Sequence, residues 1–326
     1  MPYRACRSRV LIAICGLAIG MGALSVGLRQ TSRQQRLSKD PTGPSFVLHS
    51  VKKDKEVCIP FEFRNGELHV RATVQGKQVD CLVDTGTNVI TCPQTLNLQG
   101  RYVRPSGLNG VDGQFRPGKD IVLPEFRLGD YELRNVTVTA LAPTTGSQGN
   151  CDKSIVLGAP AFEQLALTLD FEHHHLVLHP SDYDPAPTIH AQTVARFDQV
   201  TFFRNIPTIE GTLEGHKATF IIDTGCDNMM VIPKFAHKFL NDKQPDPEIS
   251  RTLLGSRKES LIHHVRFVVP GFLDMTIDPV NVVSIAGSGD AAIGLGILNR
   301  FRITIDYPRR RMIWECVHPE NHYVYH

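Results

Sequence analysis

The sequence VDCLVDTG occupies Val79–Gly86, and ATFIIDTG occupies Ala218–Gly225. Each copy is an apolar run that ends in Asp-Thr-Gly, and the two aspartates, Asp84 and Asp223, are 139 positions apart. A single Asp-Thr-Gly is first of all a turn sequence, because Gly tolerates positive φ and Asp caps turns. Two copies in matched surroundings predict a duplicated domain that brings two carboxylates together.

The repeat extends beyond these two stretches. Ile155–Gly158 aligns with Ile293–Gly296 at a spacing of 138, and Leu167–Phe171 aligns with Ile303–Tyr307 at a spacing of 136. In each half a polar triplet then follows, His173–His175 or Arg309–Arg311, and it leads into an apolar run. Because the spacing drifts by so little, we interpret the chain as two similar halves.

The patterning within the halves favours β-structure. Leu68–Val74 and Tyr131–Val138 alternate apolar and polar residues, as half-buried strands do. Long amphipathic helical patterns are scarce. The best helical candidates are short, at Pro160–Leu165, Pro233–Leu240 and Ile297–Phe301. A mainly β fold is therefore expected, and 326 residues with 41% apolar side chains suffice for about two domains.

These patterns divide the chain into segments. The proline-containing stretch 181–198 has little apolar pattern and is interpreted as a linker between the halves. The expected organisation is a signal anchor or signal peptide (1–28), a tether (29–45), a first lobe (46–180), the linker (181–198), a second lobe (199–318) and a C-terminal tail (319–326).

The N-terminus has the composition of a targeting segment. Three arginines precede the uncharged run Val10–Leu28, which is just long enough to cross a bilayer as a helix. The same run fits a secretory signal with a small-residue cleavage site at Ala23–Ser25, and a buried core helix is a third interpretation. We expect the remainder to be exported and either membrane-anchored through this helix or secreted.

Charge and cysteine content limit the possible partners and cofactors. The formal net charge of +2 and the lack of a basic stripe interleaved with aromatic residues argue against nucleic acid as a partner. Six cysteines follow the leader, and disulfides and free thiols are both open. None has the C-x-x-C spacing of a zinc site, so no metal and no cofactor are predicted.

Two histidine clusters could suggest metal binding. His173–His175 aligns with Arg309–Arg311 in the second half, which predicts an exposed hairpin turn rather than a ligand set. His263 and His264 would point to opposite faces if they lay on a strand. Neither cluster therefore predicts a metal site.

The duplicated pattern resembles the aspartic proteases of the retropepsin and pepsin kind. In that family an apolar strand leads into Asp-Thr-Gly, and a later apolar-apolar-Gly segment crosses behind that loop. The resemblance implies two β-barrel lobes related by a pseudo-two-fold axis, with Asp84 and Asp223 as the catalytic pair. It also implies that Leu157-Gly158 and Leu295-Gly296 are the crossing segments. The residues that would support the two loops are Thr85, Gly86, Thr87, Thr224, Gly225 and Cys226.

A protease of this family also needs a flap, a hairpin that closes over the substrate. The glycine-rich stretch Arg104–Phe115 is the candidate in the first half, and the second half offers only 253–260. Neither contains the tyrosine typical of pepsin flaps. The residues expected to contact substrate are Gly107, Gly110, Val111 and Gly113.

The chemistry implied is hydrolysis of peptide bonds by an aspartic endopeptidase. Two carboxylates a few ångströms apart cannot both ionise comfortably, so they share one proton. The ionised carboxylate takes a proton from water, and the protonated one donates to the peptide carbonyl. Because the Thr87 hydroxyl is a better donor than the Cys226 thiol, Asp84 is expected to ionise more readily than Asp223.

Two alternatives stay open. The same duplicated scaffold could be a module that binds peptides or partner proteins without hydrolysing them. The two halves could pair within one chain, giving a monomer that is a pseudo-dimer, or each half could pair with its copy in a homodimer. The linker of nearly twenty residues favours pairing within one chain.

Overall fold

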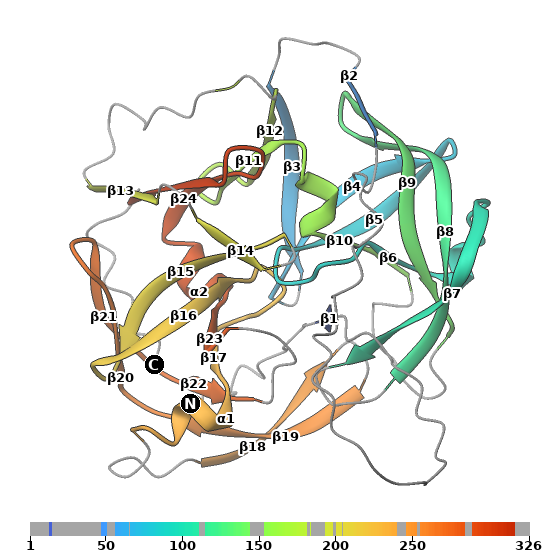
Figure 1. Ribbon diagram of the computed structural model, residues 1–326. Coiled ribbons are helices and arrows are strands. Elements are labelled where there is room, and N and C mark those ends of the chain that lie inside the picture. The colour runs from blue at the N-terminus through green and yellow to red at the C-terminus, as the bar shows by residue number, and fades with distance from the viewer. Residues whose placement is uncertain are drawn as a thin grey trace, which may run out of the picture.

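The computed structural model describes residues 13–14, 47–50, 56–64, 66–110, 115–143, 153–180, 183, 193–197, 200–203, 205–239, 246–252, 255–283 and 289–316. The predicted mainly β fold is confirmed, because these ranges consist chiefly of strands in two large sheets (Figure 1). The helical segments are short: η1 (Gln94–Leu96), η3 (Ala159–Phe162), α1 (Pro233–Ala236) and α2 (Leu295–Leu298).

The first lobe is a closed barrel. Its six strands follow one another in the order β4 (Glu67–Val74), β5 (Lys77–Asp84), β10 (Ile155–Gly158), β6 (Thr91–Pro93), β9 (Tyr131–Leu141) and β8 (Phe115–Leu128). The barrel closes where Thr73 of β4 pairs with Arg127 of β8. Three strands lie outside the ring: β7 (Arg101–Gly110) on β8, β2 (Val47–Ser50) on β9, and β1 (Ala13–Ile14) on β7.

The second lobe is a curled, open sheet. Its strands run in the order β18 (Asp246–Thr252), β19 (Gly255–Ile262), β22 (Val280–Val282), β17 (Met229–Val231), β23 (Ala291–Ile293), β16 (His216–Ile222), β15 (Ile206–Leu213), β20 (Val265–Val269) and β21 (Leu273–Ile277), and β14 (Thr201–Phe203) pairs with β15. The path from β18 to β15 parallels the path from β7 to β4 in the first lobe. The described strands are therefore consistent with two barrel lobes.

The strand that leads into each aspartate begins at the same kind of turn. β4 and β5 are joined by Gln75 and Gly76, and β15 and β16 by Glu214 and Gly215, with positive φ at all four residues. Positive φ at both central residues is the geometry of a two-residue hairpin that matches strand twist, and Gly adopts it without strain. These glycines are the ones that precede the two apolar runs in the sequence.

A sheet shared by both lobes joins them. From the first barrel the strands continue as β3 (Val57–Arg64), β12 (His175–His179), β11 (Ala166–Asp170), β24 (Phe301–Asp306), β25 (Arg311–Cys316) and β13 (Thr193–Phe197). The pairing between the lobes is β11 with β24, which are antiparallel. The stretch expected to be a linker, 181–198, thus includes β13, an edge strand of this sheet.

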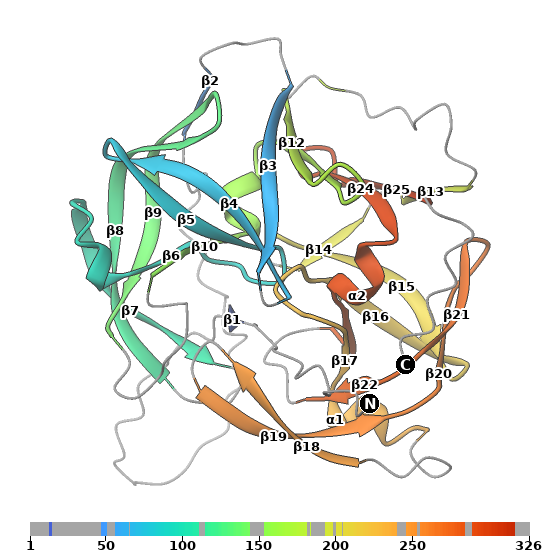
Figure 2. The same ribbon diagram turned by 180° about the vertical axis from the view of Figure 1, so that it is seen from behind.

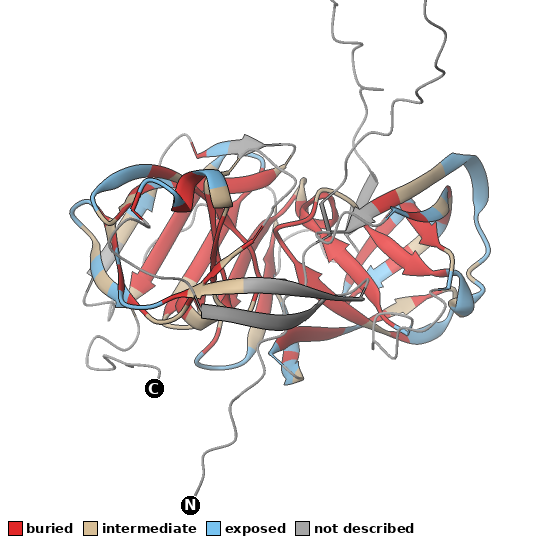
Figure 3. Ribbon diagram, turned by 90° about the horizontal axis from the view of Figure 1, so that it is seen from below, coloured by how far each residue is buried: buried red, intermediate tan, exposed pale blue. Residues whose placement is uncertain are grey.

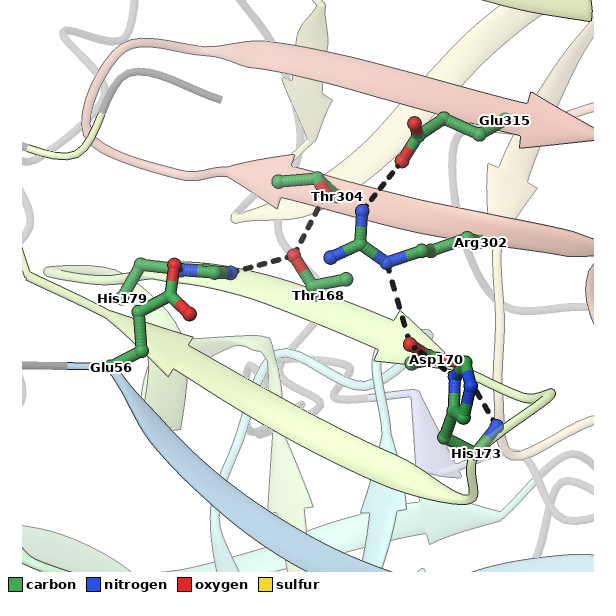
Figure 4. Close-up of polar contacts among 8 residues, drawn as sticks. All are labelled: Glu56, Thr168, Asp170, His173, His179, Arg302, Thr304 and Glu315. Carbon is green, nitrogen blue, oxygen red and sulfur yellow. Dashed lines mark hydrogen bonds and ion pairs between the residues drawn. The ribbon is translucent and has the colours of Figure 1, made fainter. Parts of the chain in front are cut away.

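The middle of the shared sheet carries a polar network (Figure 4). Thr168 lies opposite Thr304, and their hydroxyl oxygens are 2.7 Å apart. The Oγ1 atom of Thr168 also lies 2.7 Å from Nε2 of His179, which is 1% exposed. Arg302 bridges the carboxylates of Asp170 (3.5 Å) and Glu315 (2.8 Å). Because these groups come from both lobes, the network fixes the register between them.

Both lobes have apolar interiors, and buried residues fill the two halves of the molecule in Figure 3. Large core side chains include Phe126 and Tyr131 in the first lobe and Phe220 and Phe267 in the second, all at 1% exposure or less. Trp314 of β25 is fully buried in the shared sheet. Burying such side chains removes a large apolar area from water, which is the main force that holds each lobe together.

The two histidine clusters lie at the ends of strands. His173 and His174 lie in the turn between β11 and β12, as predicted, and His175 is the first residue of β12. His263 and His264, by contrast, form the turn between β19 and β20, and Nδ1 of each ring contacts the Asp278 carboxylate at 2.5 and 3.0 Å. The strand on which they would point to opposite faces ends at Ile262, so that condition is not met.

The expected leader, 1–28, lies outside the described residues except for the two residues of β1. The tether, 29–45, and the tail, 319–326, also lie outside them. Within the ranges that are described, no helix reaches the length and apolar character needed to cross a bilayer. Among the cysteines in those ranges, Cys58, Cys81 and Cys92 carry free thiols.

Candidate active site

The two aspartates end equivalent strands. Asp84 is the last residue of β5, and Asp223 directly follows β16. Both are fully buried, at 0% exposure. The backbone N–H of Gly86 donates to Oδ1 of Asp84 at 3.0 Å, and that of Gly225 donates to Oδ1 of Asp223 at 2.9 Å. Each Asp-Thr-Gly turn therefore orients its own carboxyl group in the same way.

The threonines of the two turns bind each other's backbone. The N–H of Thr85 donates to Oγ1 of Thr224 at 3.0 Å, and the N–H of Thr224 donates to Oγ1 of Thr85 at 3.1 Å. Each hydroxyl then donates across the lobe boundary, from Thr85 to the carbonyl of Ile222 and from Thr224 to that of Val83, both at 2.8 Å. Four buried hydrogen bonds thus lock the two turns face to face.

This lock brings the two carboxyl groups into contact. Asp84 and Asp223 lie within hydrogen-bonding reach of each other. A Cβ atom added to Gly86 would overlap the carboxyl group of Asp223, so only glycine fits at this position. Among the described residues, no group donates a hydrogen bond to Oδ2 of either aspartate. Oδ1 of each aspartate is thus held by its own turn, whereas Oδ2 is not.

A second segment in each lobe supports the turn from behind. β10 pairs in parallel with β5 so that Gly158 lies opposite Asp84, and the N–H of Ala159 donates to the carbonyl of Thr87 at 2.9 Å. In the second lobe β23 pairs in parallel with β16, and the N–H of Leu295 donates to the carbonyl of Cys226 at 2.7 Å. The two arrangements are equivalent.

The equivalent of Gly158 is Gly294, which corrects the sequence alignment. Ile222 lies opposite Ile293, so the residue at the position of Asp223 is Gly294, and Gly296 is two residues further on. A Cβ atom at Gly158 would overlap the carbonyl of Val89, and one at Gly294 would overlap the carbonyls of Cys226 and Asn228. The spacing of 136 found in the later repeat segments already pointed to Gly294.

Burial raises the pKa of both aspartates. The pKa of Asp84 lies well above its usual range because of burial and because of the adjacent Asp223 carboxyl. Burial raises the pKa of Asp223 to about 7, although the N–H of Gly225 and a hydrogen bond from Asp84 oppose that rise. Because both pKa values are raised, the pair favours a state in which the two carboxyl groups share one proton.

The predicted order of ionisation depended on a hydrogen bond from the Thr87 hydroxyl to Asp84. Oγ1 of Thr87 is buried and makes no hydrogen bond with any described residue, so it does not stabilise an ionised Asp84. The Cys226 thiol donates to the carbonyl of Asn228 at 2.7 Å. Among the described residues, the Thr87 hydroxyl thus does not make the bond on which the prediction depended.

Each lobe also extends a hairpin on the same side of the molecule. β7 and β8 form the one expected in the first lobe, and it contains Gly107 and Gly110, whereas Val111 and Gly113 lie outside the described residues. β18 and β19 form a longer hairpin in the second lobe than the sequence suggested. The two reach toward each other in both views (Figures 1 and 2). The turn of the β18–β19 hairpin is not evident from the sequence because Leu253 and Leu254, which lie between its strands in the chain, are not turn residues.

A separate pocket of about 450 Å³ lies on the outer face of the first lobe, between β3, β4 and the β8–β9 turn. At its base His69 is held between Asp80 (2.8 Å) and Glu67 (3.1 Å). Burial alone would raise the pKa of Asp80, but hydrogen bonds from Arg64 and Ser154 lower it overall. His69 and its two carboxylate partners thus bond one another. Neither Asp84 nor Asp223 lines this pocket.

Comparison with known proteins agrees with this site. Residues 70–161 match the model of a family described as aspartyl protease. The matched range contains the Asp84 turn and the crossing segment at Gly158, which are two of the elements described above. A comparison with curated proteins found no match. The first lobe is therefore similar to the aspartyl protease family over this range.

Proposed function

We propose that the chain is an aspartic endopeptidase in which Asp84 and Asp223 form one catalytic pair. The observation that carries the proposal is the reciprocal bonding of Thr85 and Thr224, which holds two buried carboxyl groups together. The family match of residues 70–161 supports the same class of reaction. The duplicated arrangement of the second lobe would supply the other half of the site.

In the proposed mechanism one carboxyl group of the pair is ionised and the other is protonated, and we assign the ionised role to Asp223. Ionised Asp223 accepts a proton from a water molecule as that water attacks the peptide carbonyl carbon, and protonated Asp84 donates to the carbonyl oxygen. In the tetrahedral intermediate the proton then held by Asp223 passes to the amide nitrogen, and the C–N bond breaks. Asp84 recovers its proton from the hydroxyl group of the intermediate as the new carboxyl group forms. One water is consumed, and the pair returns to its starting state.

The substrate is proposed to be an extended peptide or protein segment bound beneath the two hairpins. Its backbone would pair with strand edges, and its side chains would alternate into pockets on the two sides. Because the two aspartates meet within one chain, a monomer supplies a complete pair. Closure of the β7–β8 and β18–β19 hairpins would limit the access of bulk water.

The test is cleavage of a mixed peptide library by the full-length protein. Asp84→Asn and Asp223→Asn should each lower the rate by at least about 10²–10⁴-fold, because each removes one acid–base partner. Asp274→Asn is a matched control, since Asp274 is a half-exposed aspartate in the β20–β21 hairpin. Retention of activity in either dyad variant would overturn the proposal.

The two single variants also separate the monomer from a homodimer. If each half pairs with its copy in a second chain, one site holds two copies of Asp84 and the other holds two copies of Asp223, so each single variant keeps one intact site and part of the activity. If the halves pair within a chain, as proposed, each single variant is inactive. A parent that binds library peptides without cleaving them would instead support the binding module.

We also propose that residues 1–28 direct export and that the enzyme acts outside the cytosol, anchored in a membrane or secreted. The support is the uncharged run Val10–Leu28 with arginines before it. Fractionation of cells expressing the full chain tests this, with sequencing of the mature N-terminus to separate an anchor from a cleaved signal. Recovery of intact protein in the cytosol alone would contradict it.

A further inference from the structure

A nearly buried carboxylate links the β7–β8 hairpin to the strand behind it. Asp120 of β8 is 5% exposed and uses both of its oxygens. Oδ2 accepts from Nε of Arg104 at 2.8 Å, and Oδ1 accepts from Oγ1 of Thr139 at 2.8 Å. A charge this far from water is costly unless it is hydrogen-bonded on each side, so this geometry is strongly specified.

The three residues form a row across the sheet. Arg104 of β7 lies opposite Asp120, and Asp120 lies opposite Thr139 of β9. The N–H of Thr139 then donates to the carbonyl of Ile90 at 2.8 Å, six residues beyond Asp84. The row therefore connects the hairpin, through side chains and backbone, to the end of the segment that carries Asp84.

The pairing between β7 and β8 becomes irregular next to this row. The register between β7 and β8 shifts at Val103, which marks a β-bulge, and bulges bend and twist a strand. Toward the tip, β9 pairs with β8 only as far as Leu141 opposite Gly118, so the first residues of β8, 115–117, pair with β7. A two-stranded ribbon is only marginally stable by itself, and its direction depends on how its base is held.

We propose that Asp120 is a positioning residue for the peptidase: through Arg104 and Thr139 it sets the angle at which the β7–β8 hairpin lies over the substrate. This inference rests on the proposed function. Asp120 contacts neither aspartate of the pair in any described hydrogen bond, so it acts on the reaction through the hairpin. Arg116 adds a second attachment, because its Nε donates to the carbonyl of Ala142.

The inference predicts a particular kinetic change. In the parent the hairpin is held in the binding-competent position before substrate arrives. Without Asp120 only a fraction of molecules holds it there, and the apparent affinity falls by that fraction. Bound substrate holds the hairpin in place afterwards, so the chemical step is little affected. Asp120→Asn should raise KM about tenfold, as expected for loss of charge-assisted bonds, and leave kcat within about twofold.

The experiment uses the full-length protein and two readouts. The first is hydrogen exchange of residues 104–110 without substrate, and the second is steady-state cleavage of a peptide. Thr139→Val removes one bond to Asp120 without a change of shape, and Thr139→Ser keeps the hydroxyl. Asp274→Asn is the control, because Asp274 also binds an arginine across a hairpin, with Nε and Nη2 of Arg266 at 2.9 and 2.5 Å.

Faster exchange at 104–110 and a raised KM in Asp120→Asn and Thr139→Val, with parental values in Thr139→Ser and Asp274→Asn, support the inference. Unchanged exchange in Asp120→Asn and Thr139→Val overturns it, whatever the activity. A fall in kcat at constant KM also overturns it, since loss of folded protein acts in that way. If the parent cleaves no peptide, the proposed function fails, and exchange alone still decides whether Asp120 holds the hairpin.

Discussion

The reciprocal threonine bonds allow a quantitative test of how the two lobes are held at the aspartates. Thr224→Val preserves shape but removes a hydroxyl that accepts from the N–H of Thr85 and donates to the carbonyl of Val83. Thr224 is 0% exposed, so water cannot replace either bond. Each orphaned backbone group costs about 1–3 kcal/mol, and the two together cost about 2–6 kcal/mol of unfolding free energy.

The assay is urea unfolding followed by the fluorescence of Trp314. It is the single tryptophan of the chain, and it lies fully buried in the sheet shared by both lobes. Thr224→Ser is the matched control, because it keeps the hydroxyl and loses one methyl group, at about 0.8 kcal/mol. Thr224→Val should unfold at clearly lower urea than Thr224→Ser and should also lose activity, since the two carboxyl groups are then free to separate.

The reasoning is refuted if Thr224→Val and Thr224→Ser differ by less than about 0.5 kcal/mol and their pH–rate profiles overlay. Such a result would mean that the lobes are held by the shared sheet alone. By the equivalence of the two turns, Thr85→Val should reproduce the effect of Thr224→Val. A large difference between them would show that the two lobes contribute unequally.

Three further predictions concern the supporting glycine and two buried titrating groups. Gly294→Ala should abolish activity and lower Tm more than Gly296→Ala, because only the first places a Cβ in overlap with backbone carbonyls; thermal scans and peptide cleavage of both variants check this. Because the pKa of Asp84 is raised, the folded chain holds this proton more tightly than the unfolded chain does, and the stability of the parent falls as pH rises from about 4 through the raised pKa. Asp84→Asn has no proton to lose at this position. The Tm of the variant should therefore gain on the Tm of the parent between about pH 4 and pH 8. Burial lowers the pKa of His179 more than Glu56 raises it, so the folded state favours the neutral ring and loses stability as pH falls below about 6.5. In His179→Gln the fall of Tm between about pH 7.5 and pH 5 should therefore be smaller than in the parent. An equal fall of Tm in the two proteins would contradict the assignment.

Local signals predicted the strands and turns that carry the site. The Gly before each apolar run marks a two-residue hairpin, and the run itself marks the buried strand that ends at Asp84 or Asp223. Such signals depend on a few neighbouring residues, so they can be read without knowledge of the fold. The alignment of Gly158 with Gly296 failed because two glycines occur close together in the second half, and only strand register distinguishes them.

The raised pKa values of the two aspartates could not be predicted in the same way. From sequence, the Thr87 hydroxyl was the natural partner of Asp84, but its Oγ1 bonds no carboxylate in the structure. The pKa of a buried acid depends on burial and on charges brought near it by folding, and neither is encoded in adjacent residues. The second hairpin was underestimated for a related reason, since β18 is defined by its pairing with β19 and not by a turn sequence.

The sequence by itself therefore determined the mainly β class, the duplicated Asp-Thr-Gly turns and the choice of the two aspartates, because these depend on local pattern and repetition. Only the tertiary structure decided that Thr85 and Thr224 bind each other's backbone, that Gly294 supports the second turn and that Asp120 anchors the first hairpin. Each of these is a contact between segments far apart in the chain. Such contacts follow from strand register and lobe packing, which no single stretch of sequence specifies.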